Sequence, residues 1–226
     1  LAKHVKAVLD DGDFPLVLGG DHSMSIGSLA GIGAHCKEQG KTLGVIWIDA
    51  HADMNTAQTT PSGNIHGMPL AVAMGHGHPT LTSLMGDFPK IDPTNVAIIG
   101  LRSIDDGERD LIRETGVAAY TMFDVDRLGI YHIASRVLED MARRVDHLHI
   151  SFDCDGVDPF VAPGVGTPVP GGLSYRETHL FMEMISEVEA FASFEVAEVN
   201  PILDDRNRTA IFAAEVVASS MGKRIL

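Results

Sequence analysis

The chain has 226 residues, 45% of them apolar, which suits one globular domain with a substantial core. Its 31 acidic residues exceed its 17 lysines and arginines by 14, and this negative charge disfavours a nucleic acid or an anionic membrane surface as partner. Two cysteines are too few for a disulfide framework, and no apolar run approaches the about 18 residues that span a bilayer, so we expect a cytoplasmic protein.

Apolar residues recur with helix spacing and strand spacing in turn along the chain. In chain order, we expect a helix at 1–9, a strand at 14–18, a helix at 24–39, a strand at 42–48, a short helix at 69–74, a strand at 95–100, a helix at 106–115, a short strand at 117–120, a helix at 130–144, a strand at 147–152, a helix that a capping box starts at Ser174, a strand at 191–197 and a helix at 207–221. This alternation indicates a three-layer α/β protein, with a parallel central sheet covered by helices on both faces. We expect residues 1–226 to form a single domain.

Acidic side chains and histidines follow the predicted strands directly. The clearest case is Asp49-Ala50-His51-Ala52-Asp53, at the start of a long polar loop. Alternate side chains of an extended backbone share one face, so positions 49, 51 and 53 converge. Ligands of parallel sheets bind beyond the carboxyl ends of the strands. The other polar groups in such positions are Asp21-His22, Asp105, Asp153-Cys154-Asp155 and Glu198.

Six of these side chains have the chemistry of metal ligands: His22, Asp49, His51, Asp53, Asp153 and Asp155. Carboxylates held so close together repel one another, and bound cations remove the conflict. Six ligands exceed the need of one tetrahedral zinc and suit two oxygen-preferring ions with two bridging aspartates. The mixed carboxylate and imidazole set favours manganese, with iron, cobalt or zinc as weaker alternatives. We expect the site at the carboxyl ends of the strands.

Each segment also has a simpler interpretation when it is taken alone. Residues 49–53 are compatible with a solvated loop or a helix cap, and 153–156 with a turn. Residues 19–23 are compatible with a strand-to-helix turn, and they lack the lysine and the spacing of a phosphate-binding loop. The occurrence of all three segments after strands favours the metal site.

Five segments carry a more specific signal: GGDHS at 19–23, DAHADMN at 49–55, SGNIHG at 62–67, SFDCDGVDP at 151–159 and EVNP at 198–201. In this order they resemble the signature segments of the ureohydrolases, and of the arginases in particular. The resemblance runs from about Phe14 to the C-terminus. It implies a binuclear manganese hydrolase that cleaves L-arginine to L-ornithine and urea by attack of a metal-bridging hydroxide on the guanidinium carbon.

The resemblance also implies a role for each ligand. His22, Asp49, Asp53 and Asp153 would hold one Mn²⁺, and Asp49, His51, Asp153 and Asp155 the other, so that Asp49 and Asp153 bridge two ions per chain. Asp53 would act in catalysis together with His66 and Glu198.

Further residues match positions that contact the substrate in the family. His66 would carry a proton to the leaving amine, because histidine titrates near the working pH. Glu198 would bind the guanidinium group. Asn55, Ser62 and Asn64 match contacts to the α-carboxylate, and Asp105 matches the acid near the α-amino group. Thr167 matches a threonine that helps to hold the guanidinium site.

Three other functions remain open at this point. An agmatinase or another guanidino-acid hydrolase shares the metal segments. A deacetylase-like zinc hydrolase uses one ion and has no need of His22 and Asp53. A metal-stabilised subunit without turnover is the non-enzymatic alternative.

The chain departs from the family pattern at its start. The family begins with a further strand, helix and strand, and their absence from residues 1–226 would leave one sheet edge uncovered. The resemblance also implies a homo-oligomer, a trimer or a hexamer.

Overall fold

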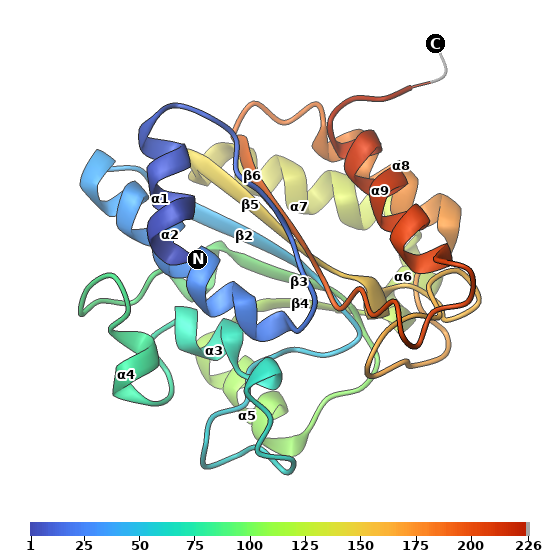
Figure 1. Ribbon diagram of the computed structural model, residues 1–226, viewed down its shortest axis with the longest axis horizontal. Helices are drawn as coiled ribbons and strands as arrows, with labels where there is room; N and C mark the ends of the chain where they lie inside the picture. Colours follow the sequence, from blue (N-terminus) through green and yellow to red (C-terminus); the bar gives the residue numbers. More distant parts are fainter. Residues whose placement is uncertain (225–226) are drawn as a thin grey trace.

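Six parallel strands form one sheet in the computed structural model, which describes residues 1–224 (Figure 1). The strands are β1 (Leu16–Leu18), β2 (Leu43–Ile48), β3 (Val96–Leu101), β4 (Ala118–Thr121), β5 (His147–Asp153) and β6 (Phe191–Ala197). Their order in the sheet is β1-β6-β5-β2-β3-β4. Strands β2 and β3 are buried along their whole length, which explains their nearly continuous apolar sequences, and β5 is buried along its whole length as well.

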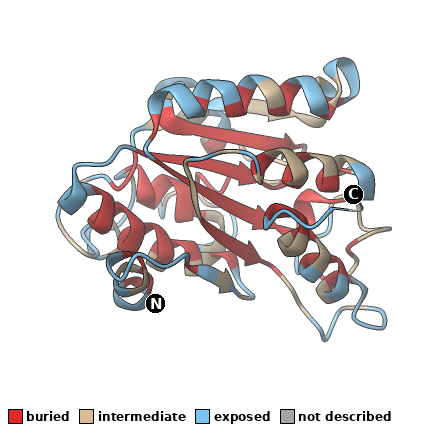
Figure 2. Cartoon of the chain, turned by 90° about the horizontal axis from the view of Figure 1, so that it is seen from above, coloured by how far each residue is buried: buried red, intermediate tan, exposed pale blue. Residues whose placement is uncertain are grey.

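Helices cover both faces of this sheet. One layer consists of α1 (Ala2–Asp10), α2 (Ser25–Gln39), α3 (Pro69–Ala73) and α5 (Asp106–Thr115). The opposite layer consists of α6 (Met122–Leu128), α7 (Ile130–Arg144), α8 (Tyr175–Ile185) and α9 (Arg208–Ser220). Figure 2 shows the buried strands between the two layers. Neighbouring strand residues serve different cores, since Trp47 packs with the first layer and Ile48 with the second. The predicted three-layer α/β architecture is confirmed.

Local sequence signals explain where several helices begin and end. Helix α2 ends at Gly40, whose φ of 64° is left-handed. The capping box at the start of α8 is confirmed: the Glu177 carboxylate accepts the Ser174 N–H at 2.8 Å, and Ser174 Oγ accepts the Glu177 N–H at 3.3 Å.

The prediction missed two helices, α6 and the short α4 (Pro79–Thr82). A capping box of Thr121 and Asp124 starts α6, and Gly129, with a φ of 80°, separates it from α7. Four 3-10 turns were also missed: η1 (His22–Met24), η2 (Ile65–Gly67), η3 (Pro93–Asn95) and η4 (Cys154–Gly156). The first strand begins at Leu16 and not at Phe14, because Pro15 has no N–H to donate to the sheet.

Strand β1 forms one edge of the sheet. Within residues 1–224 it pairs only with β6, where Leu16 lies opposite Phe194 and Leu18 opposite Val196. Leu16 is 39% exposed and Leu18 is 68% exposed. Strand β1 is therefore an edge strand with exposed apolar side chains within the described residues. None of the helices within these residues has both the length and the apolar character needed to cross a membrane.

Candidate metal centre and substrate cavity

The parallel strands bring the predicted site residues to one edge of the sheet. His22 lies in η1 after β1, Asp49 follows β2, Asp153 ends β5 and Glu198 follows β6. Asp105 follows β3 and caps the start of α5. These are the carboxyl ends of five strands, and they meet because all the strands run in the same direction.

The first metal-capable group surrounds His22. Its Nδ1 lies 2.8 Å from Asp153 Oδ2, 3.1 Å from Asp53 Oδ2 and 3.3 Å from Asp49 Oδ2. The four side chains are buried. Three carboxylates around one imidazole nitrogen form a donor set for a divalent cation.

The second metal-capable group surrounds His51. Its Nδ1 lies 3.1 Å from Asp155 Oδ2 and 3.4 Å from Asp49 Oδ1. Asp49 thus offers one carboxylate oxygen to each group, and its atoms fall within both sets of potential ligands. This is the geometry of a bridging carboxylate. Asp153 belongs only to the first set, so its bridging role stays a prediction.

One feature of the structure supports cation binding by these side chains without reference to any related protein. Asp53 Oδ2 is buried and has no hydrogen-bond partner; its contact with His22 Nδ1 at 3.1 Å is close but is not aligned as a hydrogen bond. A buried carboxylate oxygen without a partner is costly, and a cation would satisfy it. The Cys154 thiol, a soft metal ligand nearby in sequence, does not belong to the site, because it packs in the apolar core on the α7 side of the sheet.

The electrostatics of the metal-free cluster show the same conflict. Burial and the charge of Asp49 raise the pKa of Asp53 to about 8. Burial and the neighbouring carboxylates Asp155 and Asp49 raise the pKa of Asp153 well above its usual range. Burial acts to lower the pKa of His51, but the carboxylates of Asp155 and Asp49 outweigh it and raise that pKa to about 11. The metal-free cluster therefore holds protons at neutral pH.

Metal binding is consequently expected to release protons. A pKa above 7 means that the group keeps its proton at pH 7, and a metal ligand must lose it. Both Asp53 and His51 are in this state, so apparent metal affinity should fall as the pH is lowered. Titration of the chelator-treated protein with Mn²⁺ in weak buffer at pH 7 should acidify the solution. Metal uptake without proton release would contradict this assignment of charge.

Two residues that the sequence analysis did not select hold Asp49 in place. The Trp47 indole stacks on the His22 ring, with centroids 4.2 Å apart, and donates its N–H to Asp49 Oδ2 at 2.9 Å. Gly156 lies so close to this segment that a Cβ there would come within 3.0 Å of the Asp49 backbone nitrogen. Alternation along β2 was the only available signal for Trp47, and it does not distinguish a core residue from a support of the site.

A cavity of about 270 Å³ opens over the metal-capable groups. His51, Asp53, Asp153 and Asp155 contribute to its lining. All five residues predicted for the substrate apart from Glu198 line it as well: Asn55, Ser62, Asn64, Asp105 and Thr167. The structure therefore brings residues of the 49–67 loop together with Thr167, which is at least 100 positions away in the sequence.

Glu198 and His66 lie in an adjoining cavity of about 400 Å³, which shares Asn64, His66 and Thr167 with the first. The His66 Nδ1 to Glu198 Oε1 distance is 4.0 Å. Glu198 is mostly buried, and its Oε1 accepts the His22 backbone N–H at 2.8 Å. Burial raises the pKa of Glu198. A cationic ligand in this cavity would favour the charged form of the carboxylate.

Several predicted residues also contact one another. Asn55 Nδ2 donates to Asp105 Oδ2 at 2.9 Å, so the amide orients the acid. Thr167 Oγ1 donates to Asp155 Oδ2 at 2.9 Å, which links Thr167 to a metal-ligand candidate. Glu108 was missed: its buried carboxylate accepts the Asp105 N–H at 2.8 Å and the Met54 N–H at 3.1 Å. The capping-box spacing of Asp105 and Glu108 was the signal that would have found it.

Two site residues have left-handed backbone conformations that side chains other than glycine rarely adopt. Asp53 has a φ of 52° and Glu198 has a φ of 61°. Strain of this kind persists where the surrounding structure holds it, often at functional sites. Both side chains line the cavities described above.

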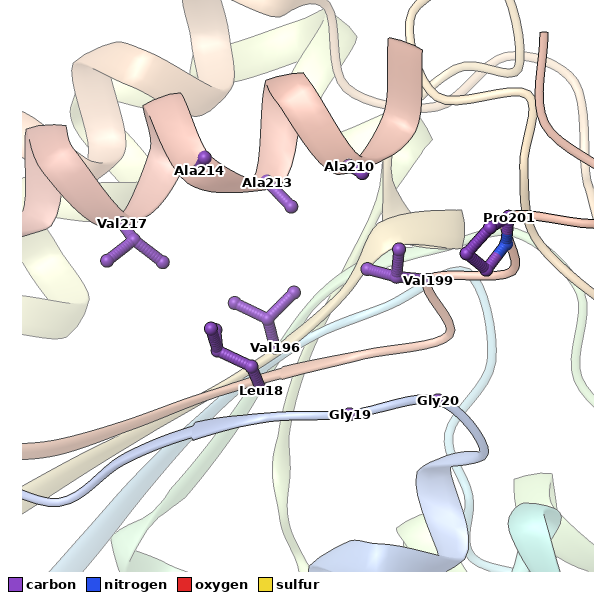
Figure 3. A pocket seen from close by; sticks show the side chains of 10 residues that line it. All are labelled: Leu18, Gly19, Gly20, Val196, Val199, Pro201, Ala210, Ala213, Ala214 and Val217. Atoms are coloured by element: carbon purple, nitrogen blue, oxygen red, sulfur yellow. The ribbon is translucent and has the colours of Figure 1, made fainter. Parts of the chain in front are cut away.

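A third pocket, of about 490 Å³, lies between β1, the end of β6 and α9 (Figure 3). Leu18, Val196, Ala213 and Val217 are among the side chains around it. No acid, histidine or cysteine lines this pocket. Although it is larger than the cavity over the metal-capable groups, it offers no groups for acid–base or metal chemistry.

The parallel α/β fold and the two donor groups at its carboxyl edge define the class as an α/β protein with a candidate two-metal centre. The model described as "Arginase family" matches residues 1–222, and the chain belongs to this family. It is 54% identical to the arginase of Bacillus caldovelox over 226 residues, which are 100% of this chain and 74% of that protein. It is also 54% identical to the arginase of Bacillus subtilis, of which it covers 75%.

Comparison of the structure with solved structures finds arginases as well. The solved structure of the arginase from Bacillus caldovelox matches with a TM-score of 0.95 and 53% sequence identity. The match covers 100% of this chain and 74% of that one. The resemblance seen in the five sequence segments is confirmed.

Proposed function

We propose that the protein hydrolyses L-arginine to L-ornithine and urea at this metal centre. The observation that carries the proposal is that two donor groups sharing Asp49 adjoin a cavity lined by polar side chains suited to an amino acid. Membership of the arginase family supports the same reaction.

The residues that would hold the ions are His22, Asp49, Asp53, Asp153 and Asp155 together with His51. We propose two Mn²⁺ per chain, because four carboxylates and two imidazoles form a hard and intermediate donor set without a thiolate. Divalent ions held in this way lower the pKa of a bound water and polarise the group that it attacks.

The chain's own side chains bind the substrate and move the proton. Glu198 would pair with the guanidinium cation, since a carboxylate has the complementary charge and two acceptor oxygens. Water adds to the guanidinium carbon, and the bond from this carbon to the side-chain nitrogen of arginine breaks. The departing amine needs a proton, which His66 at the edge of the cavity would deliver.

The head group of the substrate would lie on the long loop. Asn55, Ser62 and Asn64 present neutral polar groups to the cavity, which suits the α-carboxylate of arginine. Asp105, held by Asn55, would accept from the α-amino group. Agmatine lacks the carboxylate, so these contacts favour arginine over agmatine.

A urea-release assay on arginine, agmatine and guanidinobutyrate tests the substrate, with metal content measured on the same sample. We expect the manganese-loaded protein to release urea fastest from arginine, because only arginine satisfies both the carboxylate donors and Asp105. Faster release from agmatine would show that the substrate assignment is wrong. No urea from any of the three would overturn the reaction itself.

We infer further that residues 1–226 act as a single domain and that the protein is a cytoplasmic homo-oligomer. Family membership supports these inferences.

A further inference from the structure

A row of polar side chains lies buried beneath the metal centre, within the sheet. His147, His149 and Ser151 alternate along β5, and Ser193 and Glu195 alternate along the neighbouring β6, so they share one face. Each is at most 1% exposed. Burial of so many polar groups is costly unless they are paired. Each of these side chains should therefore have a hydrogen-bond or charge partner within the fold.

Glu195 has the largest potential cost, because it is a carboxylate with 0% exposure. Its Oε1 accepts the Ser25 hydroxyl at 2.6 Å, and its Oε2 accepts the Ser28 hydroxyl. His149 Nε2 lies 3.3 Å from Oε1, an electrostatic contact that is not aligned as a hydrogen bond. Burial acts to raise the pKa of Glu195, but His149 and the Ser25 hydroxyl outweigh it and lower that pKa to about 2. The group is thus a charged anchor.

The two serines place this anchor at the start of α2. Ser25 is the first residue of the helix, and Ser28 lies in its first turn. Partial positive charge at a helix N-terminus stabilises a carboxylate there. The η1 turn that carries His22 ends at Met24, directly before Ser25. The position of the α2 start therefore sets the position of the His22 turn.

Strand β6 and Glu198, the residue directly after it, hold the same segment at three further points. The Gly19 N–H donates to the Val196 carbonyl at 3.0 Å, and the Glu198 N–H donates to the Gly20 carbonyl at 2.7 Å. The His22 N–H donates to Glu198 Oε1 at 2.8 Å. β6 in turn pairs with β5 next to Asp153. The distance between His22 and Asp153 thus depends on the contacts that β6 and Glu198 make with residues before and after the η1 turn.

We infer that Glu195 is a positioning residue for His22: through Ser25 and Ser28 it holds the turn so that the imidazole faces Asp153, Asp53 and Asp49. The inference rests on the proposed metal centre. It gives Glu195 no contact with metal or substrate. It assigns a function to a buried charge that the reaction itself does not use.

The test measures the dissociation constant of Mn²⁺ for the chelator-treated full chain. Trp47, the single tryptophan, stacks on His22 and donates to Asp49, so its fluorescence reports directly on the site. Elemental analysis confirms the amount bound. The variants are Glu195→Gln, which keeps the size and removes the charge, and the double variant Ser25→Ala/Ser28→Ala, which removes both hydroxyl donors.

Both variants are expected to raise the Mn²⁺ dissociation constant about tenfold, the lower end of the effect of groups that orient metal ligands. The control is Ser219→Ala, which removes a hydrogen bond to the buried His179 but touches neither Glu195 nor His149 nor any residue from 19 to 28. It should leave the dissociation constant unchanged, whatever it does to the free energy of unfolding.

Unchanged Mn²⁺ binding in Glu195→Gln would overturn the inference, and so would equal weakening in Ser219→Ala. If Glu195→Gln does not fold, the double serine variant decides by the same criterion. The outcome is independent of the proposed reaction, because no turnover enters the measurement. A parent chain that binds Mn²⁺ and releases no urea would refute the reaction and leave the positioning role to be judged by the dissociation constants.

Discussion

Replacement of Asp49 by asparagine is expected to remove both metal ions and to lower the rate of urea release at least about a thousandfold, or about 4 kcal/mol in activation free energy. Asp49 is the side chain that belongs to both metal-capable groups around His22 and His51. An amide in its place brings no charge to either ion. Loss of one shared ligand should therefore affect both sites, whereas His51→Ala should affect chiefly one.

Elemental analysis of dialysed protein and an arginine assay check this result. Asp126→Asn is a matched control, because it removes the same charge from an exposed surface position. It should retain two ions and full activity. Two retained ions in Asp49→Asn would show that Asp49 does not bridge.

Replacement of Glu198 by glutamine is expected to lower kcat/KM for arginine about thirtyfold or more, which corresponds to about 2 kcal/mol or more for the loss of one member of a partly buried charge pair. The metal content should not change, because Glu198 belongs to neither of the two groups around Asp49. The glutamine carbonyl can still accept the His22 N–H, so the turn keeps its support. The effect should therefore appear in substrate handling alone.

Asp21→Asn separates direct contact from a general field effect. Asp21 is exposed, and its carboxylate lies within 4.8 Å of ligand atoms of His66 and Glu198. If Glu198 contacts the guanidinium directly, loss of the Asp21 charge should have a much smaller effect. Equal losses in the two variants would point to the field of the cavity, and loss of metal in Glu198→Gln would make that residue a support of His22.

Patterns in the sequence predicted most of the secondary structure. Helices 106–115 and 130–144 and strand 191–197 have the predicted boundaries. Helix 130–144 has regular apolar spacing, and helix 106–115 lies between a capping box at Asp105 and the left-handed Gly116. The helix Met122–Leu128 was missed, since its short apolar pattern runs into the next helix and only Gly129 divides them. Strand order was not predicted at all, because pairing depends on crossovers whose direction is not encoded in spacing.

The ligand segments were also predictable, since Asp49, His51 and Asp53 stand beside one another in the chain and alternate on its backbone. The residues that hold the ligands in place through contacts between distant segments were not predictable. Trp47 and Glu195 look like ordinary strand residues, and their roles arise from partners as far away as Ser25, which lies 170 positions from Glu195. Long-range pairing of buried polar groups leaves no local pattern.

The amino-acid order of this protein specifies which side chains can bind metal and that they follow strands, because strand geometry and residue chemistry are local. The order of the strands in the folded sheet, β1-β6-β5-β2-β3-β4, determines which side chains come into contact. It places His22 against Asp153 and His51 against Asp155. These contacts depend on strands that are distant in sequence and adjacent in space. The division of Asp49 between two histidines is therefore a property of the tertiary structure.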